Sequence, residues 1–155
     1  MKVYSQGILP ASNIYFHTKS EIANKMYFYP LCTGHYFCDS SYVVNRNSYN
    51  SYLLLYVVRG SGYVVCDKTE KTVEAGNIFL LDCYKPHQYG TRKGWEIFWV
   101  HYDSIMARAY FDTITQGKNC VVLLPPDPQS VRYNLEKIYM MYHKSGQSSE
   151  PKANK

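Results

Sequence analysis

The sequence predicts a mainly β protein whose C-terminal end is helical. The chain of 155 residues contains 17 tyrosines and 6 phenylalanines but only 19% charged residues, and aromatic residues of this kind favour strands. Turn signals recur about every eight to twelve residues up to residue 102, as in sandwiches and barrels. After Asp103 the apolar residues follow a helical period. These three observations indicate one β domain followed by helices.

The first part of the chain, residues 1–24, is expected to form an N-terminal arm, because its apolar side chains are isolated and follow no sustained period. Residues 25–102 are expected to form a barrel. Its early strands are short, and Pro30 should end the first of them. They are predicted over Met26 to Tyr29, His35 to Phe37 and Tyr42 to Val44.

A long apolar strand is expected in the middle of the barrel, over Tyr52 to Val58. Both of its faces are apolar, as in a central strand that is buried from both sides. It should end at Arg59 to Gly62, where two glycines suggest a tight turn or a bulge. The remaining strands are predicted over residues 62–66, 71–73, 78–81, 87–89 and 95–102.

A helical extension is expected over residues 103–155. Met106, Tyr110 and Ile114 lie four residues apart, which predicts a helix that Gly117 would end. A connecting strand over residues 121–124 leads to a second helix that begins near Pro128. The apolar face of that helix is expected to extend up to Gly146 and to consist of Val131, Leu135, Ile138 and Tyr142.

The cysteines and the charges argue against several other classes of protein. The five cysteines are odd in number and none forms a Cys-x-x-Cys pair, so neither a disulfide framework nor a zinc site is indicated. The chain has no signal-like N-terminus and no apolar run of about eighteen residues, so a cytoplasmic protein without membrane contact is expected. The net charge is +5, but the basic residues are scattered, which argues against a nucleic-acid surface on this domain.

Four segments in order resemble the sensor domain of AraC-type bacterial transcription regulators. The segments are YLLLYVVRGSG at residues 52–62, EAGNIFLL at 74–81, YKPHQY at 84–89 and WEIFWVHY at 95–102. The similarity extends over roughly residues 29–142. The order and spacing of the four segments make the resemblance specific, whereas any one of them alone would be a weak signal.

The resemblance implies a double-stranded β-helix (cupin-like) barrel, whose mouth holds a small effector, often a sugar, followed by helices that mediate dimerisation. Members of this family carry two helix-turn-helix motifs after the sensor, and residues 103–155 contain no basic recognition helix of that kind. The chain is therefore expected to be an effector-sensing and dimerisation domain, truncated before a DNA-binding domain. It would form a homodimer in the full-length regulator and contact DNA only through the absent domain.

The effector site is expected on one face of the strand over residues 95–102. Alternation of side chains places Glu96, Phe98, Val100 and Tyr102 on the opposite face. The resemblance points to Trp99 and Tyr89 as pocket residues, because flat rings suit a sugar or another rigid apolar ligand; core packing is the alternative for both. The face that carries Trp99 consists of Trp95, Ile97, Trp99 and His101.

Two polar residues complete the expected site. The resemblance places Arg46 at an effector-binding position of the family after one gap, and the alternative is an ordinary exposed arginine. His87 is expected to be a structural or pocket-lining polar group. The further candidate ligand-binding residues are His35, Tyr29, Phe16, Trp95 and Ile97.

Neither catalysis nor a cofactor is expected. His87 follows Pro86 at a place where cupin enzymes often carry a metal ligand, but residues 49–58 contain no His, Asp or Glu to complete a metal site. No nucleophile with a paired base and no phosphate-binding loop is recognisable. Two other functions stay open, namely a small metal-dependent cupin enzyme that acts on a sugar or sugar derivative, and a domain that only dimerises.

Overall fold

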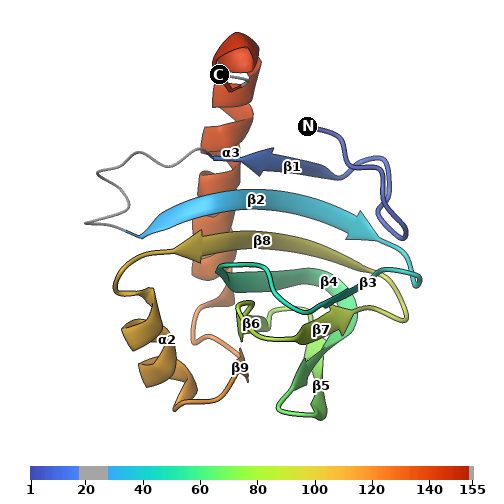
Figure 1. Cartoon of the computed structure of the whole chain (residues 1–155). Coiled ribbons are helices and arrows are strands. Elements are labelled where there is room, and N and C mark those ends of the chain that lie inside the picture. Colours follow the sequence, from blue (N-terminus) through green and yellow to red (C-terminus); the bar gives the residue numbers. More distant parts are fainter. Residues whose placement is uncertain (18–27, 154–155) are drawn as a thin grey trace.

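The computed structural model describes residues 1–17 and 28–153 (Figure 1). In this part of the chain strands predominate, and two helices follow them, as the sequence predicts. The elements are β1 (Asn13–Phe16), β2 (Tyr29–Cys38), β3 (Val43–Arg46), β4 (Tyr52–Cys66), β5 (Thr69–Glu74), β6 (Ile78–Asp82), β7 (His87–Gly90), β8 (Trp95–Asp103), α2 (Ala107–Thr115), β9 (Cys120–Leu123) and α3 (Pro128–Ala153).

Two antiparallel sheets share the long strand β4. One sheet has the strand order β1-β2-β8-β4-β6-β9, and the first half of β4 belongs to it. The second half of β4 pairs with β5 and β7, and β7 pairs with β3. Buried side chains from both sheets, such as Leu55 and Val64, belong to one apolar core. The predicted double-stranded barrel is confirmed.

Strand β4 continues through the two glycines at which a turn or a bulge is expected. Its pairing with β8 shifts register between Val57 and Arg59, which is the signature of a bulge. Gly60 has a φ of 78°, and a Cβ atom there would lie 2.2 Å from the carbonyl oxygen of Gly94. Glycine is required at this position because it tolerates both the positive φ and the close approach of the neighbouring backbone. The bulge, and not a turn, is the correct interpretation.

Strand β2 includes Pro30, which was expected to end the preceding strand. The pairing of β2 with β8 shifts register between Pro30 and Cys32, and a bulge of this kind tolerates a residue without an N–H donor. Residues Met26 and Tyr27 of the predicted strand lie outside the described residues.

Part of the expected N-terminal arm is attached to the first sheet. Strand β1 pairs with β2, and Ile8 forms an isolated bridge with Cys38. The backbone N–H of Leu9 also donates to the carbonyl oxygen of Phe37 at 2.8 Å. The arm therefore extends the sheet at its edge, and residues 18–24 of the arm lie outside the described residues.

Helix α3 covers the outer face of the first sheet (Figure 1). Leu135 and Tyr139 are buried there against Phe98 and Val100, and Val131 and Ile138 pack around them, as the predicted apolar face requires. The helix extends to Ala153, beyond the Gly146 at which its apolar face was expected to end. No helix among the described residues is both long and apolar enough to cross a membrane.

Helix α2 forms where a helix is predicted, but it buries a different face. Met106, Tyr110 and Ile114, whose spacing predicts the helix, are 51%, 55% and 50% exposed. The residues that α2 buries are Ala107, Phe111 and Thr115. The helix ends at Thr115, two residues before Gly117.

One disulfide bond corrects the expectation from the cysteines. Cys66 at the end of β4 is bonded to Cys120 at the start of β9, across 54 residues of sequence. The bond joins a hairpin of the second sheet to the edge of the first sheet. Cys32, Cys38 and Cys83 are buried free cysteines.

Candidate functional site

The alternation predicted for β8 places its two tryptophans inside the barrel. Trp95, Ile97 and Trp99 belong to the core between the two sheets, whereas Phe98 and Val100 lie under α3. The ring of Trp99 lies 5.5 Å from that of His101, which is also buried. This face of β8 therefore forms one wall of the barrel interior.

Strands β3 and β7 bring two further predicted site residues to the same end of the barrel. Arg46 and His87 are direct cross-strand partners. The ring of His87 is nearly parallel to that of Tyr89, with their centroids 6.5 Å apart. Arg46 and His87 also both lower the pKa of His101. Four predicted site residues are thus brought together: Arg46, His87, Tyr89 and Trp99.

Two nitrogen atoms of this group are buried without a hydrogen-bond partner in the described part of the chain. They are Nε2 of His87 and Nε1 of Trp99, in residues that are 5% and 6% exposed. Nδ1 of His87 is 2.7 Å from the carbonyl oxygen of Lys85, so in the neutral ring it donates and Nε2 is left as an acceptor. Unpaired buried polar atoms are costly, and a bound molecule could satisfy both.

The histidines of the site are held in the neutral form. Burial lowers the pKa of His101 to about 3, and the charges of Arg46 and His87 act in the same direction. Burial also lowers the pKa of His87, although its hydrogen bond to Lys85 opposes this shift. Near neutral pH both rings therefore offer one donor and one acceptor each.

A cavity of about 550 Å³ opens beside His87, where β7 begins. Such a volume lies within the usual range of small-molecule sites. Its wall combines apolar and polar side chains, and of the four residues brought together only His87 lines it. Nζ of Lys85 donates to Oδ1 of Asn119 at 3.0 Å in this wall. The side chains that offer hydrogen bonds in this wall belong to Asn45, Asp67, Lys68, Lys85, His87, Gln88 and Asn119.

The other predicted site residues do not join this group. His35 lies on the outer face of the sheet, where its ring stacks on Phe98 at 4.0 Å. Trp95 faces inwards at the opposite end of β8, and Ile97 is fully buried in the core. Tyr29 pairs with Asp103, beyond His101.

Phe16, the candidate from the arm, is 59% exposed at the sheet edge.

Sequence reasoning missed three residues that shape the site. Tyr49 packs its ring 4.6 Å from that of His101, and the guanidinium of Arg46 lies 4.9 Å from the centre of the Tyr49 ring. Ser51 Oγ lies 2.9 Å from Nδ1 of His101. Both residues follow the polar stretch that contains Arg46, which is the one signal that pointed to them. Asn119 has no such signal, because the fold brings it to the cavity from beyond α2.

Lowering the pH is expected to destabilise the fold through His101. The pKa of His101 is about 3 in the folded state and 6.5 without the fold, so only the unfolded state takes up a proton between these values. The contribution of His101 to the free energy of unfolding is therefore largest above pH 6.5. Below pH 6.5 it falls by up to about 1.4 kcal/mol per pH unit.

Urea unfolding at pH 7, 6 and 5 measures this slope. In the variant His101→Gln the free energy of unfolding should depend less steeply on pH, by an amount that corresponds to the uptake of nearly one proton fewer on unfolding. Equal slopes in the two proteins would show that His101 titrates normally.

Comparison with known proteins supports one family. The model of the AraC-like ligand binding domain matches residues 29–154. A search of curated protein sequences gives no significant match.

Among the described residues, no group of three or more His, Cys, Asp or Glu side chains could hold a metal ion.

Two solved structures share the fold at low sequence identity. YhaK from Escherichia coli is similar with a TM-score of 0.57 and 10% identity, over 74% of this chain and 51% of that protein. A mutant of the oxalate decarboxylase OxdC from Bacillus subtilis has a TM-score of 0.50 and 14% identity, over 66% of this chain and 27% of the enzyme. The chain thus spans about half of the first protein and about a quarter of the second. Because the family model covers most of its length, the chain belongs to the AraC-like ligand binding domain family.

Proposed function

We propose that the chain is the effector-sensing and dimerisation domain of an AraC-type bacterial transcription regulator, and that its effector is a carbohydrate. The observation that carries this proposal is the pair of buried, unpaired nitrogen atoms on His87 and Trp99, beside Arg46. A ligand that fills this end of the barrel would satisfy polar atoms that the protein alone leaves unsatisfied.

A carbohydrate has the chemistry that these groups require. Nε2 of His87 accepts a hydrogen bond and Nε1 of Trp99 donates one, and a sugar hydroxyl does both. The guanidinium of Arg46 offers further donors at the exposed end of the site. The flat rings of Trp99 and Tyr89 suit the apolar face of a pyranose or furanose ring.

The proposal assigns no reaction to the domain. Its buried histidines are neutral, and its membership of a ligand-binding family favours sensing over catalysis.

Dimerisation is assigned to the region of α3. The inner face of this helix packs on the sheet, while Tyr133 and Met141 remain exposed. DNA contact would come from a further domain of the regulator, in the bacterial cytoplasm.

A thermal-shift screen against mono- and oligosaccharides at millimolar concentration tests this function. A sugar at about 100 times its dissociation constant adds about 2.7 kcal/mol to the free energy of unfolding, which raises Tm by several degrees. The variant Arg46→Gln should lose most of this shift.

Arg132→Gln is the matched control, because Arg132 lies on α3 and pairs with Glu136. It should keep the full shift. If no sugar raises Tm, the carbohydrate assignment is wrong. If a sugar raises Tm equally in both variants, the sugar binds elsewhere.

A further inference from the structure

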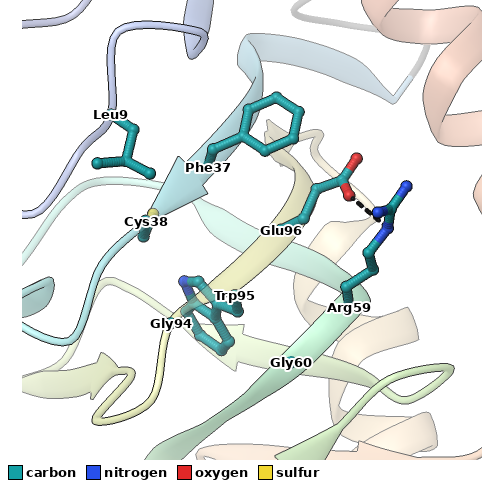
Figure 2. A pocket seen from close by; sticks show the side chains of 8 residues that line it. All are labelled: Leu9, Phe37, Cys38, Arg59, Gly60, Gly94, Trp95 and Glu96. Atoms are coloured by element: carbon teal, nitrogen blue, oxygen red, sulfur yellow. Dashed lines mark ion pairs between the residues drawn. The ribbon is translucent and has the colours of Figure 1, made fainter.

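A second cavity, of about 280 Å³, lies at the end of the barrel where β8 begins (Figure 2). The arm contributes Leu9 to its wall, and β2 contributes Phe37. Trp95 lines it from β8, at the opposite end of this strand from His101. The backbone of Gly60, at the bulge of β4, completes the wall. This second cavity is therefore largely apolar and separate from the group around His87.

The buried carboxylate of Glu96 and its two partners form the polar wall of the second cavity. Glu96 is only 8% exposed, and its Oε1 lies 2.9 Å from Nε2 of His35. Its Oε2 lies 3.2 Å from Nε of Arg59. Figure 2 shows Arg59 reaching across from β4 to this carboxylate. Both carboxylate oxygens of Glu96 are therefore engaged, and the guanidinium of Arg59 lies at the rim of the cavity.

The polar groups of this wall that are available to a ligand are the N–H donors of Arg59. A guanidinium carries five N–H donors, and among the described residues the guanidinium of Arg59 has one ion-pair partner, Glu96, which lies next to Nε. The side chain of Arg59 is 82% exposed, so its terminal nitrogens are accessible. Since Glu96 lies next to Nε, the two terminal nitrogens are left as a fork of donors of the kind that binds carboxylates in a bidentate manner.

The size and the charge of the second cavity select the ligand. Its volume corresponds to about nine water molecules at their share of liquid volume, which is enough for a small organic acid. The carboxylate of Glu96 is paired with the charge of Arg59, and Lys93 precedes the Gly94 that lines the cavity. The whole chain carries a net charge of +5.

We infer that the second cavity is a binding site for a small carboxylic acid with an apolar body. Its carboxylate would accept two hydrogen bonds from the terminal nitrogens of Arg59. Its apolar body would lie against Leu9, Phe37 and Trp95. A ligand bound there would contact the arm at Leu9, β4 at Arg59 and Gly60, and β8 at Trp95, so it would hold the arm on the barrel.

Benzoate is the probe, and benzamide is its neutral counterpart of nearly the same shape. Titration of the ¹⁵N-labelled chain with benzoate should shift the backbone amide signals of Gly60 and Gly94, whereas benzamide should shift them little. In Arg59→Gln the affinity for benzoate should fall at least tenfold. Arg92→Gln, which replaces another exposed arginine whose partner is Glu70, should leave the affinity unchanged.

Three results would overturn this inference. The first is the absence of any shift at Gly60 and Gly94. The second is equal affinity for benzoate in Arg59→Gln and in the unmodified chain. The third is a set of shifts at Gln88 in place of Gly60, which would put the acid in the cavity beside His87 and would leave the sensing function untouched.

Discussion

Replacing Phe111 with alanine is expected to lower the free energy of unfolding by about 3 to 5 kcal/mol. The ring of Phe111 is 1% exposed and lies 4.9 Å from that of Tyr52. It belongs to the cluster that attaches α2 to the first sheet, together with Leu80 and Ala107. Removal of the ring leaves a cavity under a short helix that has few other contacts to hold it.

Tyr110→Ala is the matched control for this experiment. Tyr110 directly precedes Phe111 in α2 and is 55% exposed. Its ring makes one edge-to-face contact, with the half-exposed ring of Phe28. Its loss should cost less than about 1 kcal/mol. Urea unfolding followed by circular dichroism compares the two variants, and similar costs would mean that α2 does not dock through Phe111.

Replacing Gly34 with alanine is expected to lower the free energy of unfolding by about 2 to 3 kcal/mol and to displace Trp99. A Cβ atom at Gly34 would lie 2.4 Å from the indole ring of Trp99, which covers this point of β2. The indole is 6% exposed and has little space to retreat. The same variant should weaken effector binding, because the indole can no longer present its Nε1 in the same place.

A double mutant isolates this clash. In a Trp99→Leu background the indole is absent, so Gly34→Ala should no longer lower the free energy of unfolding and should raise it by up to about 1 kcal/mol, since glycine is less favourable than alanine in a strand. If Gly34→Ala were equally destabilising in both backgrounds, the cost would arise in the backbone of β2 and not at the indole.

The two helices show how far periodicity alone can predict packing. In α3 the residues that the pattern identifies, such as Leu135 and Ile138, do face the sheet. In α2 two sets of residues are spaced four apart. One set is Met106, Tyr110 and Ile114, and the other is Ala107, Phe111 and Thr115. Which set is buried depends on the direction from which the helix approaches Tyr52, and local spacing does not encode that direction.

The placement of the candidate site residues was predicted in part, for a similar reason. Alternation along β8 is a local property, and it correctly placed Trp99 inside the barrel. The pairing of Arg46 with His87 depends on the register of β3 and β7, whose sequences lie about forty residues apart, and only the family resemblance suggested both residues. The outward direction of His35 follows from its place on β2, where Cys32 and Tyr36 face the core.

The disulfide could not be predicted from the cysteine spacing. Cys66 lies in the half of β4 that belongs to the second sheet, and Cys120 begins β9 at the edge of the first sheet. The two cysteines meet only because the two sheets pack on each other, which is a property of the whole fold. An odd number of cysteines without a Cys-x-x-Cys pair gives no information about one isolated bond.

The sharing of β4 by the two sheets has a consequence for dividing the chain. The sequence from Arg59 to Gly62 has the glycine content of a linker, yet it is the point at which one continuous strand passes from the first sheet to the second. Fragments cut at Gly60 would each contain half of a strand and an incomplete sheet, so neither fragment is a folding unit. Protein insertions and circular permutation should therefore be directed to the loops. The barrel should not be cut between Arg59 and Gly62, although this segment is rich in glycine.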